Sequence, residues 1–219
     1  VSKMNAERVK TDVPDIKFAD YCYNPIDEMN ILQKGTETAD LEFKNKGVRF
    51  VTVGRLSEEK GYFRLISILA RLKKEGYDFS LIIIGDGPER EKLLKHCDEL
   101  NMNDRVVFLL EQKNPFKYVS KSDVFVCSSF EEGYSTACTE ACILNVPVVT
   151  TSVGGAEEII NDAGCGLLCD LSDEGLYGAL KSVLDNPQMI DEWKETLKDT
   201  KKNFFASERV KRLYNIFGV

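Results

Sequence analysis

Two positively charged side chains stand where the sequence could bind a phosphate-bearing ligand. Arg55 and Lys60 follow Gly54, the glycine that ends a short β-branched segment. The planar fork of an arginine and the mobile charge of a lysine together suit a diphosphate. An ordinary solvated turn, with Lys60 at the start of a helix, is the alternative for these residues taken alone.

Two carboxylates follow a later apolar segment. Gly133 would allow a ligand to approach the backbone closely, and the helix expected after it offers unpaired N–H groups to an anion. Glu132 precedes this helix, and Glu140 lies two turns into it. Because eight residues turn a helix by about 800°, both carboxylates reach one ligand only if Glu132 lies in a loop above the helix. In that position they would accept hydrogen bonds from sugar hydroxyls. Otherwise Glu132 only interacts with the helix dipole, and Glu140 is solvated.

Two other patterns give weaker indications. The sequence Gly85–Arg90 resembles half of a dinucleotide-binding fingerprint, but it lacks the third glycine and favours a tight turn into a helix. The seven cysteines are scattered through apolar surroundings, and the only histidine is His96, so buried reduced thiols are favoured over a zinc site. No Asp-x-Asp sequence occurs, and we therefore expect no divalent metal beside the phosphates.

Short apolar segments alternate with helical ones from residue 48 onward. The apolar segments are Val48–Val53, Leu81–Ile84, Val106–Leu110, Val124–Cys127, Val146–Val149 and Gly166–Cys169. Apolar periodicity and start signals favour helices at 61–75, from Pro88, and near 115–121, 134–145 and 155–161. Continuously apolar strands that alternate with helices are typical of a parallel sheet covered on both faces.

The predicted fold is therefore α/β, with a Rossmann-like parallel six-stranded sheet and helices on both faces over residues 48–170. Ligands of such sheets bind at the carboxyl ends of the strands. The charged residues described above stand at two of these ends.

The two flanks differ from this core. Residues 1–47 are polar, with an extended patch at 16–23 and a turn at 24–27, and they favour a hinge or linker with a partial element. Residues 171–219 are rich in charge with regularly spaced apolar positions, which predicts carboxy-terminal helices packed on the core.

Composition excludes several classes of function. The net charge is −7 and no basic stretch is dense, so nucleic acid is not an expected partner. The longest apolar run, Val106–Leu110, is far too short for a transmembrane segment. The first twenty residues are charged and lack the apolar centre of a secretory signal.

Four patterns occur in a fixed order at the expected strand ends. They are Gly-Arg-Leu-x-x-x-Lys-Gly at 54–61, Ile-Gly-x-Gly-Pro-Glu at 84–89, Ser-x-x-Glu-Gly at 129–133 with Glu140-Ala141, and Val-Gly-Gly-x-x-Glu-Ile-Ile at 153–160. Together they resemble the carboxy-terminal, donor-binding domain of a family-4 retaining glycosyltransferase with the GT-B fold. The resemblance covers about residues 22–170.

This resemblance implies roles for particular residues. Arg55 and Lys60 would hold the nucleotide diphosphate and offset the charge of the leaving group. Glu132 would contact the donor sugar nearest the reacting carbon, and Glu140 would bind ribose hydroxyls. Further donor contacts are implied for Gly54, Gly133, Tyr134, Ser135 and Thr136, and for Leu110 and Glu111 beside the base. Leu110 stands where the family commonly has a small residue.

The implied activity is transfer of a hexosyl unit from a nucleotide sugar, with a UDP-sugar as first choice over GDP and ADP sugars. The acceptor would be a glycan or lipid-linked molecule in bacterial polysaccharide or glycoconjugate biosynthesis. GT-B enzymes have two facing domains, and this chain opens at Val1 in what resembles the hinge. We therefore expect a donor-binding half that transfers little by itself, because the acceptor would bind to the amino-terminal domain. We expect it in the cytoplasm, or at the inner face of the membrane in the full-length enzyme.

Two other classes of function remain open from the sequence. A nicotinamide- or flavin-dependent oxidoreductase shares the fold class, but the glycine fingerprint after the first strand and the acidic residue about 20 positions later are absent. A non-catalytic nucleotide-binding or docking module would use the carboxy-terminal helices as its contact surface. Loss of nucleotide binding in Lys60→Ala or Glu140→Ala would separate both alternatives from a donor domain.

Overall fold

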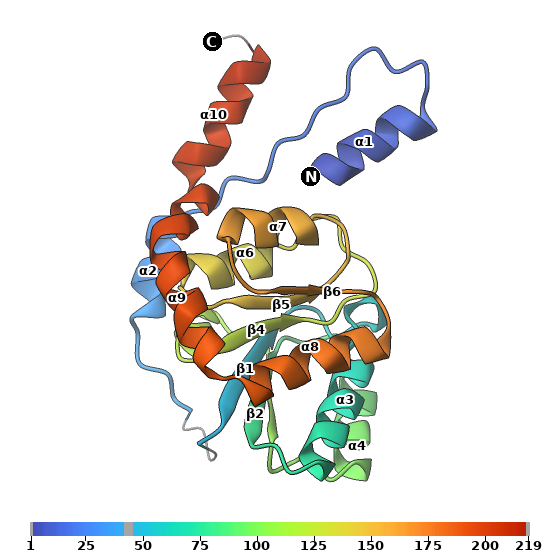
Figure 1. The fold of residues 1–219 in the computed structure, drawn as a ribbon, viewed down its shortest axis with the longest axis vertical. Helices are drawn as coiled ribbons and strands as arrows, with labels where there is room; N and C mark the ends of the chain where they lie inside the picture. Colours follow the sequence, from blue (N-terminus) through green and yellow to red (C-terminus); the bar gives the residue numbers. More distant parts are fainter. Residues whose placement is uncertain (1, 42–45, 218–219) are drawn as a thin grey trace.

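The computed structural model describes residues 2–41 and 46–217, with a single six-stranded parallel sheet at its centre (Figure 1). The strands are β1 (Val48–Val53), β2 (Phe79–Ile84), β3 (Val106–Leu109), β4 (Val124–Cys127), β5 (Val148–Thr151) and β6 (Leu167–Cys169). They lie in the order β3-β2-β1-β4-β5-β6, and every neighbouring pair is parallel. The predicted Rossmann-like sheet is confirmed.

Successive strand residues point to opposite sides of the sheet, so its buried apolar residues lie on both faces. Helices cover both of these faces. The helices are α1 (Lys3–Asp12), α2 (Glu28–Gly35), α3 (Tyr62–Lys74), α4 (Arg90–Glu99), α5 (Phe116–Val119), α6 (Thr136–Ile143), α7 (Ala156–Ala163), α8 (Asp173–Asp185), α9 (Gln188–Thr200) and α10 (Ala206–Phe217). Two short 3-10 helices, η1 (Glu58–Lys60) and η2 (Lys201–Phe204), complete the order. Phe50 packs with α3, α4 and α8, whereas the next residue, Val51, packs with α2, α5, α6 and α7.

The fifth strand lies two residues later than its apolar run suggests. The sequence favours 146–149, but β5 spans Val148–Thr151. Pro147 has no N–H to give to the ladder, and it only accepts from Phe125 just before the paired segment. The strand then continues into Thr150 and Thr151, which are β-branched and buried despite their hydroxyls.

The segment before the sheet contains two helices that the polar sequence did not specify. Ser2 caps α1 by accepting from the N–H of Asn5, and Asp27 caps α2 in the same way from Asn30. Helix α2 packs on α5 and α6 through the buried Ile31, so this part of the flank belongs to the core. Residues 42–45, within the predicted linker, lie outside the described residues.

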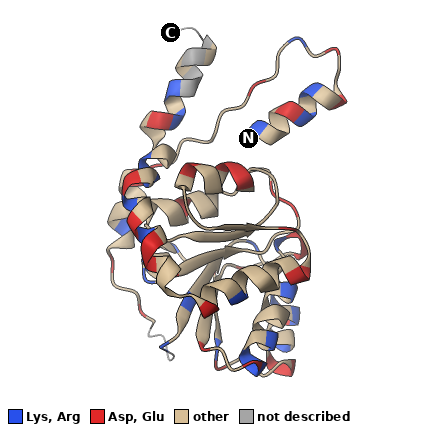
Figure 2. Cartoon of the chain, in the orientation of Figure 1, with Lys and Arg blue, Asp and Glu red and all other residues tan. Residues whose placement is uncertain are grey.

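The predicted carboxy-terminal helices are present as α8, α9, η2 and α10. Helix α8 buries Leu176 and Leu180 on the face with α3, while Leu197 of α9 and Phe204 of η2 are buried on the opposite face. Acidic and basic side chains are interspersed along α9 (Figure 2). In the described part of the chain, no helix is long and apolar enough to cross a bilayer.

The order of the strands defines where a ligand can bind. The chain runs outward from β1 to β3 on one side and from β4 to β6 on the other, so β1 and β4 meet at the point where the direction reverses. In open α/β sheets the loops beyond the carboxyl ends of these two strands diverge and leave a crevice. Gly54–Gly61 follows β1, and Ser128–Ser135 follows β4.

Candidate functional site

A cleft of about 370 Å³ lies at the carboxyl ends of β1 and β4. Seven of the residues predicted from the sequence line it: Gly54, Lys60, Glu132, Tyr134, Ser135, Thr136 and Glu140. The floor is formed by the ends of the two strands, together with Tyr62 from the first turn of α3. Two loops that lie about 70 residues apart in the sequence therefore form the two walls of one site.

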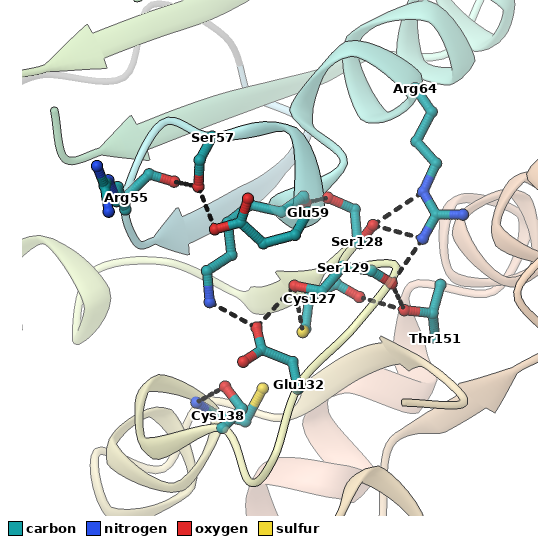
Figure 3. A network of polar contacts seen from close by, with 12 residues as sticks. Arg55, Ser57, Glu59, Arg64, Cys127, Ser128, Ser129, Glu132, Cys138 and Thr151 are labelled. Atoms are coloured by element: carbon teal, nitrogen blue, oxygen red, sulfur yellow. Dashed lines mark hydrogen bonds and ion pairs between the residues drawn. The ribbon is translucent and has the colours of Figure 1, made fainter. Parts of the chain in front are cut away.

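Lys60 and Glu132 form an ion pair across this cleft, with 2.7 Å between Nζ and Oε1. The same carboxylate oxygen accepts a second hydrogen bond of 2.7 Å from Ser129 Oγ (Figure 3). Glu132 lies in the loop before α6, which is the placement that lets it serve one ligand together with Glu140. The two side chains are 26% and 13% exposed, so the pair is partly shielded from water and still reachable by a ligand.

Gly61 brings the two loops together. It has φ +66°, a left-handed conformation that favours glycine, and a Cβ there would collide with the main-chain carbonyl of Ser128. The N–H of Phe130 donates to the carbonyl of Glu59 at 2.8 Å, and Ser128 Oγ donates to the carbonyl of Lys60 at 2.9 Å. The loop after β1 therefore lies directly against the loop after β4.

The amino terminus of α6 opens into the same cleft. Its cap, Ser135, accepts a hydrogen bond from the N–H of Cys138 at 3.3 Å. The N–H groups of Thr136 and Ala137 make no hydrogen bond to any other described residue. Free N–H groups and the positive end of the helix dipole favour an anion at this point, a few residues from Glu132.

Glu140 lies further along α6 and lines the same cleft. Burial raises the pKa of Glu140 from 4.5 to about 7, because the charged form loses its hydration. Near neutral pH this carboxyl is therefore poised between its two forms. It can accept hydrogen bonds from a hydroxyl pair when ionised.

A second cavity of about 500 Å³ adjoins the first, and the two share Val53 and Gly54 as lining residues. Arg55 and Glu111 line this second cavity, together with the turn at Gly85 and Asp86. Figure 3 shows the side chain of Arg55 pointing away from Glu132, so the structure brings Lys60, but not Arg55, to this carboxylate.

The remaining predicted residues have other positions. Leu110 is 48% exposed and is absent from the linings of both cavities. Gly133 lines a broader hollow of about 1110 Å³ between α1 and the two loops. The Gly85–Arg90 segment is a tight turn whose backbone packs on the loop after β1: Leu56 donates to the carbonyl of Asp86 and accepts from the N–H of Glu89.

Three residues that support the site were missed by the sequence analysis. Ser129 orients Glu132, and its place in the Ser-x-x-Glu-Gly pattern was the available signal. Arg64 and Arg209 are both buried and both contact the loop after β4. A charged residue within the apolar face of a predicted helix was the signal for Arg64, whereas nothing local marks Arg209.

The positions of the cysteines and acidic residues bear on disulfide formation and metal binding. All seven cysteines are free. Among residues 2–41 and 46–217, no three His, Cys, Asp or Glu side chains are grouped in a way that could hold a metal ion.

The family model described as glycosyl transferases group 1 matches residues 33–202 of this sequence. The chain belongs to this family. The match includes both loops and α6. The family model therefore covers the strand-end patterns on which the resemblance rests. The resemblance to the donor-binding half of a GT-B glycosyltransferase is confirmed for the family and the fold.

Two relatives are similar over most of the chain. One is the N-acetylgalactosamine-N,N'-diacetylbacillosaminyl-diphospho-undecaprenol 4-alpha-N-acetylgalactosaminyltransferase of Campylobacter jejuni, 34% identical over 190 residues, which are 86% of this chain and 50% of that protein. The lipopolysaccharide core biosynthesis glycosyltransferase LpsD of Rhizobium meliloti is 29% identical over 177 residues, 80% of this chain and 50% of that protein. This glycosyltransferase chain spans about half the length of both relatives.

Solved structures share the fold at lower identity. Staphylococcus aureus TarM, in a complex that includes UDP, gives a TM-score of 0.79 at 15% identity over 100% of this chain and 43% of that one. Anabaena HepE in complex with UDP gives a TM-score of 0.74 at 19% identity, covering 91% of this chain and 57% of that one. The chain therefore shares its fold with about half of each of these two solved chains.

Proposed function

We propose that this chain is the donor-binding half of a retaining hexosyltransferase and that it binds a nucleoside diphosphate sugar in the cleft between β1 and β4. The observation that carries the proposal is the Lys60–Glu132 ion pair of 2.7 Å beside the amino terminus of α6. One cation, one carboxylate and unpaired N–H groups converge there, which matches the chemistry of a sugar attached to a diphosphate.

Each part of the donor has a counterpart in the cleft. The diphosphate lies against the N–H groups of Thr136 and Ala137 and draws Lys60 toward it. Glu132, partly released from Lys60, accepts hydrogen bonds from the donor sugar. Glu140 accepts from the ribose hydroxyls, and the base extends past Gly54 into the neighbouring cavity beside Glu111. Arg55 lines that second cavity and reaches the diphosphate from the opposite side of Gly54.

The same groups stabilise the leaving group. When the bond to the sugar breaks, a nucleoside diphosphate departs with negative charge that grows in the transition state. The N–H groups at the start of α6 are fixed donors at this point, and Lys60 and Arg55 add positive charge when they turn toward the leaving group; positive groups placed in this way lower the barrier. Attack by the acceptor requires a second wall that orients it, and we assign this task to a partner domain in the full-length enzyme.

UDP is the first choice of nucleotide, supported by the UDP named in the TarM and HepE complexes. The names of the relatives support an acceptor in bacterial glycan or lipopolysaccharide assembly. We assign the enzyme to the cytoplasm, or to the inner face of the membrane when it is full-length.

Titration of this chain with nucleotides tests the proposal. Thermal shift and calorimetry with UDP, GDP, ADP and NAD in the presence of a chelator should give a response to one nucleoside diphosphate. At a ligand concentration about 100 times the dissociation constant, the stabilisation should be about 2.7 kcal/mol. A response only to NAD would support an oxidoreductase instead. Silence from all four nucleotides would contradict the donor site and favour a docking module.

A further inference from the structure

Arg64 is a buried cation whose nearest partners are main-chain carbonyls. It lies in the first turns of α3, and only 6% of the residue is exposed. Its guanidinium donates to the carbonyl of Ser128 at 2.8 and 2.5 Å, to that of Ser129 at 2.7 Å, and to that of Leu171 at 2.7 Å. Figure 3 shows the side chain reaching from α3 to the loop after β4.

No carboxylate in the described chain lies within hydrogen-bond distance of this cation. The nearest, Asp173, is 3.9 Å away with its side chain 68% exposed, which makes it a weak counter-ion. The guanidinium also lies over the ring of Phe130, 3.8 Å from the centroid. A buried charge is costly unless hydrogen bonds satisfy it, and here three of the four hydrogen bonds given above are to carbonyls of one loop.

The carbonyls that Arg64 holds belong to the residues that place Glu132. Ser129 is bound to Arg64 through its carbonyl and to Glu132 through its hydroxyl. Thr151 of β5 donates to the same carbonyl of Ser129 at 2.6 Å and fixes it from the other side. Arg64 therefore reaches the carboxylate through a single intervening residue.

The other end of this loop is held independently. Arg209 of α10 donates to the hydroxyl of Tyr134 at 2.9 Å and to the carbonyl of Asn24 at 2.8 Å. Removal of Arg64 therefore leaves Tyr134 and the start of α6 anchored. Its loss acts first on Ser128, Ser129 and the carboxylate that they orient.

We propose that Arg64 is the positioning residue for Glu132, and that it sets the contact of this carboxylate with the sugar part of the donor but leaves the phosphate contacts to α6 and Lys60. This inference rests on the proposed function and adds a residue outside the loops. It requires a guanidinium, because a lysine ammonium cannot reach Ser128, Ser129 and Leu171 at once.

The test compares UDP with UDP-sugars on the same chain. Calorimetry uses UDP and a panel of UDP-glucose, UDP-galactose, UDP-N-acetylglucosamine and UDP-N-acetylgalactosamine, and the tightest sugar nucleotide for the unaltered chain is then applied to the variants. In Arg64→Lys, UDP affinity should change by less than about twofold, as for a substitution outside the binding contacts. Affinity for the UDP-sugar should fall about tenfold, the equivalent of one lost charge-assisted hydrogen bond.

Chemical rescue separates positioning from folding. In Arg64→Ala, added guanidinium ion should restore part of the lost UDP-sugar affinity, because it can occupy the vacated space and bind the same carbonyls. Arg71→Lys is the matched control: Arg71 lies seven residues along α3, stacks on Tyr177 and pairs with Glu174, and does not line the cleft. This control should bind both ligands normally.

Several outcomes would overturn the inference. Equal losses for UDP and UDP-sugar in Arg64→Lys would mean that Arg64 only supports the local fold, and no loss for either would mean that Glu132 needs no such support. Failure of guanidinium to rescue a folded Arg64→Ala chain would also count against it. If the unaltered chain binds neither ligand, the proposed function fails first and this inference with it.

Discussion

The side chains of Lys60 and Glu132 meet at 2.7 Å although 72 residues separate them in the sequence. The pair joins the loops after β1 and β4 where the sheet changes direction. Each charge neutralises the other until a ligand that carries both phosphate and hydroxyl groups can replace the contact. The pair therefore links the two walls of the cleft, and under the proposed function it would open to admit a donor.

Removal of either cation should weaken nucleotide binding. Lys60→Ala and Arg55→Ala are each expected to reduce the affinity for a nucleoside diphosphate by roughly 1–3 kcal/mol, the range for hydrogen bonds to charged groups. Calorimetric titration of both variants measures this loss. Lys95→Ala is a suitable control, because Lys95 lies on the exposed side of α4 and pairs only with Glu99 among the described residues.

Lys60 and Arg55 line different cavities, so the two substitutions can change nucleotide affinity by different amounts. A loss in Lys60→Ala alone would place the diphosphate in the first cleft and away from Arg55. Unchanged affinity in both variants would contradict the phosphate assignment.

The raised pKa of Glu140 should make the stability of the protein depend on pH. Well below pH 4.5 the carboxyl is protonated in both the folded and the unfolded chain, so its burial carries no charge penalty. As pH rises toward about 7, the unfolded chain ionises first, and stability is lost progressively. Glu140→Gln should therefore be more stable than the unaltered chain at pH 8, by on the order of 2 kcal/mol, and equal to it near pH 4.

Urea unfolding of both proteins across this range measures the difference. A constant gap at all pH values would mean that Glu140 does not titrate as its burial requires. Glu140→Gln should in addition bind UDP more weakly at pH 8, because its amide replaces the carboxylate that we propose accepts hydrogen bonds from the ribose hydroxyls.

Glu132→Gln should separate binding from turnover. The phosphate contacts remain, so UDP affinity of this chain should be nearly unchanged. In the full-length enzyme the same substitution should lower kcat, because the carboxylate that we propose contacts the donor sugar has lost its charge. Normal kcat in that variant would remove Glu132 from catalysis, and Glu131→Gln in the neighbouring exposed position provides the control.

Gly61 should be intolerant of any side chain. Gly61→Ala introduces a Cβ that collides with the carbonyl of Ser128, in a backbone conformation that already strains an L-residue. Gly76 has φ +94°, and a Cβ added there meets nothing within 4 Å. Gly76→Ala therefore measures the cost of the backbone conformation alone, roughly 1–2 kcal/mol. Urea unfolding should show a larger loss for Gly61→Ala, together with weaker UDP binding. Equal losses would mean that the two loops can separate without cost.

The sheet could be predicted because each strand has an apolar pattern that can be recognised in the sequence. Runs such as Val124–Cys127 are buried on both sides and therefore continuously apolar, which a parallel sheet requires. The limits of β5 were predicted less well, because Thr150 and Thr151 have polar atoms that only tertiary hydrogen bonds satisfy. Helix α1 was missed since its face is mostly polar and only Ala6 is buried within it.

The candidate site, too, could be predicted only in part. The patterns at the strand ends gave the residue types, and the structure brings Lys60, Glu132 and Glu140 to one cleft. Sequence could not give the supporting contacts of Arg64 and Arg209, because these residues act through main-chain carbonyls and hydroxyls far away in the chain. It also could not separate Arg55 from Lys60, because the direction of a loop side chain depends on packing against the neighbouring turn.

A crystal structure of this chain with UDP bound tests the proposed donor site directly. The diphosphate should lie against the N–H groups of Thr136 and Ala137, with Lys60 in contact and the ribose hydroxyls at Glu140. UDP bound at the carboxy-terminal helices, or in a cleft where Lys60 and Glu132 keep their contact and touch no ligand, would contradict it.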